Sequence, residues 1–134
     1  MKMEKLNRFK DKVVVITGAS RGIGRGIALR FASEGADLVV SANEDKVNDV
    51  AEEIRALGRA ALPVICDVSQ KSDVEVLYGK ALEEFGRVDI SVQNAGIITI
   101  AKVEEMTEDE WDSVMAVNTK GVFLCCQAAA KIMI

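Results

Sequence analysis

The sequence has 134 residues, which fits one domain and is long enough to bury a real hydrophobic core. Hydrophobic residues make up 49% and charged residues 28%, so a disordered chain and a small disulfide scaffold are both excluded. Lys and Arg number 17 against 21 Asp and Glu, and this net charge of −4 argues against a broad basic surface for nucleic acid. The absence of histidine excludes Ser-His-Asp and Cys-His nucleophiles within this chain, and metal sites that rely on imidazole.

The three cysteines, Cys66, Cys125 and Cys126, are an odd number without C-x-x-C spacing. This pattern favours buried, reduced thiols over a disulfide framework or a zinc site, and we expect no metal. Residues 1–12 alternate charges with single apolar residues and lack the apolar stretch of a signal peptide. No segment reaches the roughly 20 apolar residues that a membrane-spanning helix needs. We therefore expect a cytoplasmic protein that does not bind membranes.

The first half of the sequence predicts two strands, each followed by a helix. Residues 12–17 form a β-branched run that ends at Gly18, which is typical of a strand buried on both faces. The helix after it ends near Gly35, and its apolar face is formed by Ile23, Ile27, Ala28 and Phe31. Residues 36–41 predict the second strand. The helix that follows has its N-cap and first-turn acids at residues 43–45, ends before Gly58, and buries Val47, Val50, Ala51, Ile54 and Leu57.

The second half repeats this alternation. Residues 60–66 predict a strand, which Pro63 places at an edge of the sheet. Ser72 to Glu75 has capping-box spacing, and the helix up to Gly86 buries Val74, Leu77, Ala81, Leu82 and Phe85. Residues 88–93 predict the fourth strand. A second capping box, Thr107 to Glu110, begins a helical pattern that continues from Trp111 to the C-terminus and is weakened at Gly121.

The resulting order βαβαβαβα predicts one α/β domain over residues 1–134. Right-handed crossovers make the sheet parallel, with strand order 3-2-1-4, flanking helices and a crevice at the switch point. The fourth strand would then lie at an edge, although its sequence is typical of a central strand. We therefore expect a Rossmann-like sheet that is truncated before its remaining strands.

The strongest motif is T-G-A-S-R-G-I-G, Thr17 to Gly24, between the first strand and its helix. Glycines at Gly18, Gly22 and Gly24 allow a sharp turn and close approach to a pyrophosphate, and the first amides of the helix supply donors. The spacing G-x-x-x-G-x-G differs from the standard dinucleotide fingerprint, and no Lys-Ser/Thr pair follows. On these residues alone, nucleotide binding and a plain tight turn both remain open.

Two further segments follow strands at the carboxyl edge of the sheet, where open α/β folds bind ligands. Asn94, Ala95 and Gly96 come directly after the fourth strand, and Asp67 follows the third. The Asp67 carboxylate could accept a hydrogen bond from an adenine amino group. Both segments are equally compatible with ordinary turns.

Together these motifs resemble the short-chain dehydrogenase/reductase family, and the whole chain is similar to the N-terminal portion of its members. Thr17 to Gly24, including Ile23, matches the family's T-G-x-x-x-G-x-G coenzyme loop, and Asp67-Val68 matches its adenine contact. Gln93-Asn94-Ala95-Gly96 matches N-N-A-G, with Gln93 in place of the first Asn. The resemblance implies that Gly18, Gly22 and Gly24 hold the pyrophosphate, with Ser20 and Arg21 nearer the adenosine phosphate.

The catalytic residues of the family are mostly missing from this chain. Asn118 stands in Asn118-Thr119-Lys120-Gly121, which resembles the segment that carries the catalytic Asn, and the resemblance implies a proton-relay role. From the residues alone, Asn118 could equally be a polar residue at a kink beside Gly121. The family's Ser and Tyr-x-x-x-Lys are absent, because Tyr78 is the only tyrosine and Leu82 occupies the Lys position. We therefore predict that the chain alone is inactive.

The coenzyme can be partly predicted. Ser41-Ala42-Asn43 at the end of the second strand offers no carboxylate to repel a 2′-phosphate, and Arg21 could pair with that phosphate. This favours NADP, with NAD as the alternative, although Arg21 could also be a solvated loop charge.

The resemblance implies an NAD(P)-dependent oxidoreductase that transfers hydride between nicotinamide and a small alcohol or carbonyl substrate. Two alternatives are a dinucleotide-binding module without redox chemistry and a truncated product without a role of its own. The family's oligomer interface implies that residues 106–134 help to form a homo-oligomer, either a dimer or a tetramer. The same apolar stripe could instead only cover the sheet.

Overall fold

A computed structural model describes residues 6–134 and contains one parallel sheet of four strands. The strands are β1 (Val13–Thr17), β2 (Asp37–Ala42), β3 (Ala61–Ile65) and β4 (Ile90–Val92), in the order β3-β2-β1-β4. This confirms the Rossmann-like sheet and the 3-2-1-4 order expected from the sequence. Pro63 lies on the edge strand β3, opposite Val40 of β2, as its missing N–H predicts.

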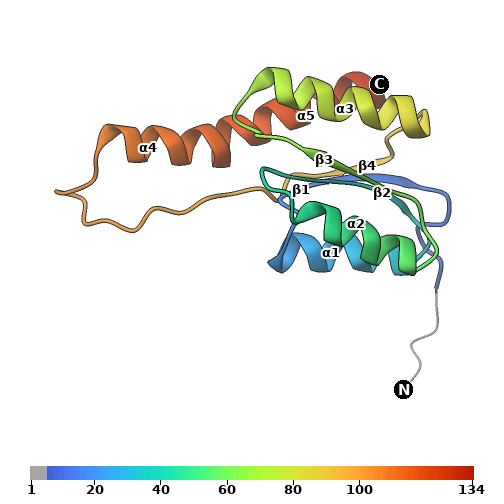
Figure 1. The fold of residues 1–134 in the computed structure, drawn as a ribbon. Coiled ribbons are helices and arrows are strands. Elements are labelled where there is room, and N and C mark those ends of the chain that lie inside the picture. The colour runs from blue at the N-terminus through green and yellow to red at the C-terminus, as the bar shows by residue number, and fades with distance from the viewer. Residues whose placement is uncertain (1–5) are drawn as a thin grey trace.

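Helices cover both faces of the sheet, as Figure 1 shows. One face carries α1 (Gly22–Ser33) and α2 (Val47–Ala56), and the other carries α3 (Lys71–Phe85) and α5 (Val122–Met133). An extended segment and α4 (Glu108–Met115) project away from the sheet, and the six-residue π-helix η1 (Ala116–Gly121) joins α4 to α5. The irregularity expected beside Gly121 is therefore confirmed and is a π-helical turn.

The central strand β1 is buried throughout, because both of its faces pack against helices. Val14 and Ile16 belong to the core beneath α1 and α2, whereas Val15 belongs to the core beneath α3 and α5. Successive strand residues point to opposite faces, so a continuous apolar run is what such a strand requires.

Strand β4 is shorter than the predicted span 88–93, and side-chain hydrogen bonds to β1 lie beyond both of its ends. At its start, the Asp89 carboxylate accepts a hydrogen bond from the Val13 N–H at 2.9 Å. Beyond its end, the N–H groups of Asn94 and Ala95 donate to the Thr17 hydroxyl at 3.2 and 3.1 Å. The backbone therefore leaves the sheet where the site begins.

Three residues assigned to the buried faces of the first three helices are exposed instead. Ile23 is 77% exposed, because it lies in the first turn of α1 at the rim of a pocket. Leu57 is the C-cap of α2 and Leu82 lies beside, not on, the inward face of α3. Tyr78 occupies the inward face of α3 with 2% exposure, a position that the aliphatic pattern did not reveal.

Only one of the expected helix caps forms. The Thr107 hydroxyl accepts from the Glu110 N–H at 3.1 Å, and the Glu110 carboxylate accepts from the Thr107 N–H at 2.9 Å. The Ser72 capping box is wrong, because α3 already begins at Lys71 and Gln70 is its N-cap. The cap expected within residues 43–45 is also wrong, since Lys46 is the N-cap of α2 and makes no side-chain cap bond.

The three cysteines are free thiols, as expected, but only two of them are buried. Burial raises the pKa of Cys66 to about 12 and that of Cys125 to about 11, so neither is an effective thiolate nucleophile. The expected burial of Cys126 is wrong, because it follows Cys125 directly and so faces away from the core on α5.

Residues 6–134 contain no cluster of His, Cys, Asp or Glu that could hold a metal ion. Within the same residues, no helix is both long and apolar enough to cross a membrane. The expectation that residues 1–12 are not a signal peptide lies partly outside the described residues, because the description begins at Leu6.

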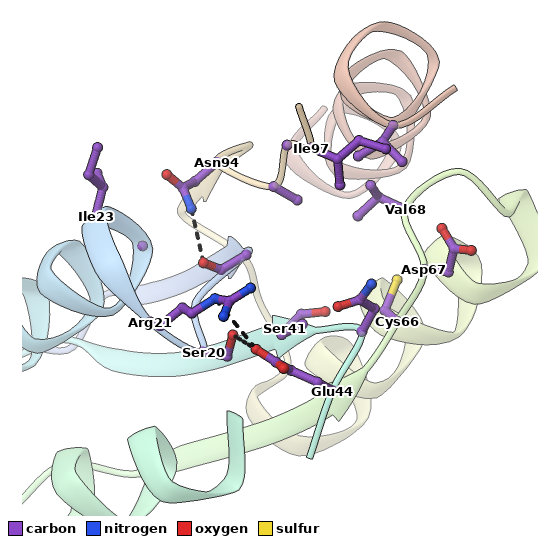
Figure 2. Close-up of a pocket in the computed structure, with 17 residues that line it drawn as sticks. Ser20, Arg21, Ile23, Ser41, Glu44, Cys66, Asp67, Val68, Asn94 and Ile97 are labelled. Atoms are coloured by element: carbon purple, nitrogen blue, oxygen red, sulfur yellow. Dashed lines mark hydrogen bonds and ion pairs between the residues drawn. The ribbon is translucent and has the colours of Figure 1, made fainter. Parts of the chain in front are cut away.

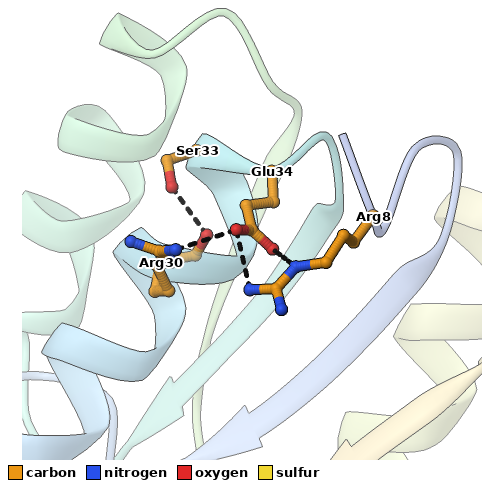
Figure 3. Close-up of polar contacts among 4 residues, drawn as sticks. All are labelled: Arg8, Arg30, Ser33 and Glu34. Atoms are coloured by element: carbon orange, nitrogen blue, oxygen red, sulfur yellow. Dashed lines mark hydrogen bonds and ion pairs between the residues drawn. The ribbon is translucent and has the colours of Figure 1, made fainter. Parts of the chain in front are cut away.

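The N-terminal segment is fastened to the turn between α1 and β2 by a buried carboxylate. Figure 3 shows Glu34, whose side chain is only 4% exposed, between Arg8 and Arg30. Two Arg8 nitrogens donate to Glu34 at 2.7 and 2.8 Å, and Arg30 donates at 2.9 Å. The Phe9 ring packs edge-on against Phe31 with ring centroids 4.7 Å apart. The hydrogen bond from Arg8 holds the pKa of Glu34 below its usual value of 4.5.

This contact predicts that Glu34→Gln lowers the free energy of unfolding at neutral pH. A carboxylate with a lowered folded pKa stabilises the native state above its unfolded pKa of 4.5, and that stabilisation is lost as the pH falls through the folded value. Urea unfolding at neutral pH should therefore separate the variant from the parent protein, and the gap should shrink below pH 4.5. The exposed Glu83→Gln is the control, and an unchanged gap at all pH values would contradict this account.

Candidate functional site

A pocket of about 390 Å³ lies at the carboxyl edge of the sheet, at the switch point between β1 and β4 (Figure 2). Every residue assigned to the coenzyme by resemblance, except Gly22, lines it: Gly18, Ser20, Arg21, Ile23, Gly24, Asp67, Val68, Asn94, Ala95 and Gly96. Segments far apart in the sequence, from Gly18 to Val117, therefore meet in one cavity.

The glycine loop needs glycine at two positions for space. A Cβ atom on Gly18 would lie 2.8 Å from the Ala95 Cα, and the backbone there has a φ of +66°. A Cβ atom on Gly24 would lie 2.1 Å from the Gly18 carbonyl oxygen. These contacts let the start of α1 lie directly against the end of β1.

Gly22 differs from these two glycines. Its φ of +58° favours glycine, but a Cβ atom there would meet nothing within 4 Å. The space beside Gly22 is therefore open, which leaves room for a ligand to approach the backbone. The helix that starts at Gly22 has no acidic residue in its first turn, and its N-cap, Arg21, makes no side-chain cap bond. Its first N–H groups thus present a positive end without a capping side chain.

Asn94 ties the glycine loop to β4. Its side-chain nitrogen donates to the carbonyl oxygens of Thr17 at 3.2 Å and Gly18 at 3.0 Å. The Thr17 hydroxyl in turn accepts the Asn94 and Ala95 N–H groups, and Thr17 is only 2% exposed. The two loops therefore form one hydrogen-bonded unit whose geometry is fixed without any ligand.

Across the pocket from Asn94, Ser20, Arg21 and Glu44 form a charged corner that the sequence did not predict. The Ser20 hydroxyl donates to Glu44 at 2.7 Å, and the Arg21 Nε lies 3.9 Å from the same carboxylate oxygen (Figure 2). The expectation that this end of the pocket has no carboxylate is therefore wrong. Glu44 lies beyond the strand residues considered, and the loop between β2 and α2 brings it back to the glycine loop.

Asp67 belongs to a local turn and also lines the pocket. One of its carboxylate oxygens accepts from the Ser69 N–H at 3.0 Å and from the Ser69 hydroxyl at 2.6 Å. Its own N–H donates to Asp73 at 3.0 Å. The turn interpretation of Asp67 is therefore confirmed. Because Asp67 also lines the pocket, a ligand can still reach it.

The pocket wall contains a buried hydroxyl, that of Ser41, next to the Cys66 thiol. Ser41 is 0% exposed and lies in the wall between the charged corner and Asp67 (Figure 2). Burying a hydroxyl is costly unless another polar group can reach it.

Asn118 supports the pocket through its side chain. Its oxygen accepts from the Ile97 N–H and its nitrogen donates to the Ile97 carbonyl oxygen, both at 2.8 Å. The oxygen and the nitrogen of the Asn118 amide thus both form hydrogen bonds to the backbone of the loop after β4. The kink interpretation of Asn118 is confirmed by η1, whereas its proton-relay role stays a prediction.

Tyr78 is not placed for acid-base chemistry in this pocket. Its hydroxyl lies 2.6 Å from the Ser91 hydroxyl, which also accepts from the Gln93 side chain at 2.8 Å. Burial raises the pKa of Tyr78. Neither Tyr78 nor Gln93 lines the pocket, and the Gln93 amide donates its hydrogen bond to Ser91.

Comparison with known protein families gives a match over nearly the whole chain. The profile of the family described as short chain dehydrogenase matches residues 12–134. A short-chain dehydrogenase/reductase, eriH, from Hericium erinaceus is 42% identical over 91% of this chain and 50% of its own length. A 3beta-hydroxysteroid dehydrogenase from Mediterraneibacter gnavus is 38% identical over 96% of this chain and 47% of its own length. The chain therefore spans about half the length of these relatives.

Solved structures give the same result. A short-chain type dehydrogenase/reductase from Mycobacterium marinum superposes with a TM-score of 0.92 at 40% identity, covering 99% of this chain and 54% of that protein. An NAD⁺-bound xylitol dehydrogenase superposes with a TM-score of 0.90 at 28% identity, covering 94% of this chain and 49% of that protein. The resemblance thus extends to the arrangement of the elements that form the pocket.

Proposed function

Because this chain belongs to the short-chain dehydrogenase family, we propose that it is the coenzyme-binding part of an NAD(P)-dependent oxidoreductase. The proposed reaction transfers hydride between nicotinamide and a small alcohol or carbonyl compound. The observation that carries the proposal is the glycine loop, locked by Asn94 at the switch point beside an open, uncapped start of α1. Phosphate groups bind at such helix starts through backbone N–H groups and the helix dipole.

The residues of the pocket fit a dinucleotide. The open space beside Gly22 suits a pyrophosphate against the loop backbone. We propose Gly18 and Gly24 as further pyrophosphate contacts from the resemblance. The Ser41 hydroxyl, in the pocket wall beside the Cys66 thiol, suits a polar group of the adenosine half, to which we also assign Asp67. The exposed Ile23 offers an apolar contact at the rim. The further coenzyme contacts proposed from resemblance are Ser20, Arg21, Val68, Ala95 and Gly96.

The coenzyme would supply the hydride chemistry, and the residues of this chain would bind and orient it. Asn94 holds the glycine loop in shape, and Asn118 holds the loop at Ile97. The proton that accompanies hydride transfer needs an acid-base residue at the substrate oxygen, and Tyr78 is buried away from the pocket. A catalytically incomplete dinucleotide-binding module is therefore the second candidate function.

We propose NADP as the coenzyme, with NAD as the alternative. The Arg21 side chain is 74% exposed at the rim of the pocket, and its 3.9 Å ion pair with Glu44 is loose enough to exchange for a phosphate. Glu44 opposes this choice, because a carboxylate repels a 2′-phosphate and accepts hydrogen bonds from ribose hydroxyls. Its 2.7 Å bond from Ser20 already occupies one of its oxygens.

A homo-oligomer, either a dimer or a tetramer, is part of the proposal. The segment that projects from the sheet exposes large apolar side chains, including Val103 at 91% and Trp111 at 59%, and α5 exposes Phe123 at 58%. Apolar surface of this kind is typical of protein interfaces. The alternative in which the stripe only covers the sheet does not account for these exposed side chains.

We also propose a cytoplasmic location. The three cysteines are free thiols, and one of them, Cys126, is exposed. Reduced thiols persist in a reducing compartment. The proposed substrates are small alcohols or carbonyl compounds, and neither nucleic acid nor membrane is a proposed partner.

The first test is coenzyme binding by the variant Gly22→Val. A side chain at Gly22 would fill the open space beside the loop, so we expect the affinity for NADPH to fall by more than about tenfold. Calorimetric titration measures the affinity, and circular dichroism checks folding. The matched control is Gly58→Val, since Gly58 also has a positive φ and open space but follows α2 and is not part of the glycine loop. Equal affinities for Gly22→Val and the parent protein would refute the loop assignment.

Coenzyme choice is tested by reversing the charge of Arg21 and, separately, removing the charge of Glu44. We expect Arg21→Glu to weaken NADPH binding by about tenfold and to change NADH binding little, because a charge-assisted phosphate contact is lost. We expect Glu44→Gln to strengthen NADPH binding severalfold, since the repulsion is removed. If Glu44→Gln instead weakens NADH binding and Arg21→Glu leaves NADPH binding unchanged, NAD is the coenzyme.

The 134-residue chain alone should bind coenzyme without measurable turnover. The physical reason is that no tyrosine-lysine pair is available to move the substrate proton. Nicotinamide absorbance, followed with a panel of alcohols and carbonyl compounds, measures turnover, and titration of the same sample confirms binding. Turnover that persists through repeated purification and disappears in Gly22→Val would show that the chain carries its own acid-base group.

A further inference from the structure

The π-helical turn η1 contacts two separate loops of the pocket within four residues. Asn118 makes both of its 2.8 Å hydrogen bonds to Ile97, in the loop after β4. Gly121 contacts Val68, in the loop after β3. Both loops line the pocket, so one wall of the pocket is supported by a single turn of helix.

Position 121 requires glycine because a side chain there would have no space, and not because the backbone adopts an unusual conformation. The φ of Gly121 is −59°, which any residue can adopt. A Cβ atom there would lie 2.8 Å from the Val68 Cγ2, 3.2 Å from the Val68 carbonyl oxygen and 3.3 Å from the Val68 Cβ. Because Val68 is only 6% exposed, it has little room to move away. A side chain at Gly121 would therefore push the Val68 loop and η1 apart.

The other loop also contacts η1, at an ordinary packing distance. A Cβ atom on Gly96 would lie 3.4 Å from the Asn118 side-chain oxygen, so the loop after β4 rests directly on η1. Hydrogen bonds to both the N–H and the carbonyl of Ile97 fix that loop in position and orientation. A displacement of η1 at Gly121 is therefore expected to reach Ile97 through Asn118.

We propose that Gly121 is a positioning residue: its missing side chain lets η1 seat against Val68 and hold the Val68 and Ile97 loops at the separation that the ligand requires. The proposal rests on the proposed coenzyme function for its ligand. It does not depend on the choice between NAD and NADP, because the adenosine diphosphate portion is common to both.

The experiment compares Gly121→Ala with the parent protein, using ADP as the probe. We expect the affinity for ADP to fall by about tenfold, because the overpacked contact displaces the wall of the pocket. The matched control is Gly79→Ala on α3, where an added Cβ meets nothing within 4 Å and the ADP affinity should be unchanged.

Rescue separates positioning from general destabilisation. Val68→Ala removes the Cγ2 atom that a methyl group added at Gly121 would meet, so in that background Gly121→Ala should cost about threefold or less. An equal loss of ADP affinity in both backgrounds would overturn the proposal, as would parent-like affinity in Gly121→Ala. If Gly121→Ala does not fold, recovery of folding in the Val68→Ala background supports the contact, and failure there overturns it.

Amide hydrogen exchange in the ligand-free protein makes the inference testable even if the coenzyme function is wrong. The N–H groups of Ser69 and Ile97 donate to Asp67 and Asn118, one in each loop. We expect Gly121→Ala to speed exchange at both amides and Gly79→Ala to speed it at neither. If the parent protein does not bind ADP, the proposed function fails, and exchange alone decides the role of Gly121. Unchanged exchange at Ile97 would overturn the coupling.

Discussion

The site depends on the close approach of the loops that follow β1 and β4. Neighbouring parallel strands end at the same edge of the sheet, which places Gly18 next to Ala95 although the two lie far apart in the sequence. Only a glycine at position 18 permits this distance, and only then can Asn94 reach the carbonyl oxygens of the loop. The position of α1, and with it the open helix start at Gly22, follows from this contact.

Much of the fold could be predicted because its signals are local. An apolar run such as 12–17 needs burial on both faces, and Pro63 needs an edge, so the strand order followed from the sequence. The errors arose at positions where tertiary contacts determine where a helix begins or which side chain is buried. Ser72 fits a capping box by spacing, yet α3 already begins at Lys71. Asp73, in the first turn of this helix, accepts a hydrogen bond from the Asp67 N–H. Tyr78 is buried because Ser91 offers its hydroxyl a partner, which no periodicity reveals.

The candidate site divides in the same way. Its glycine loop and the residues after β3 and β4 carry motifs, and the structure brings them together as expected. Glu44 could not be placed, because its position depends on how the loop between β2 and α2 returns toward Ser20. The support from η1 was also hidden, since it depends on a distance between Gly121 and Val68 that no motif encodes. Sequence motifs thus identified groups that face the pocket and the two Asn residues that support it, but not the contacts through which they support it.

The hydrogen bonds from Asn94 to Thr17 and Gly18 span 77 and 76 residues, and this separation has a consequence for folding. Pairing of β1 with β2, and of β2 with β3, closes much shorter loops and therefore costs less chain entropy. We expect the three-stranded layer to assemble first and β4 to add late. A nascent chain can then hold most of its sheet before it has any pocket, so capacity to bind a ligand marks the last stage of its folding.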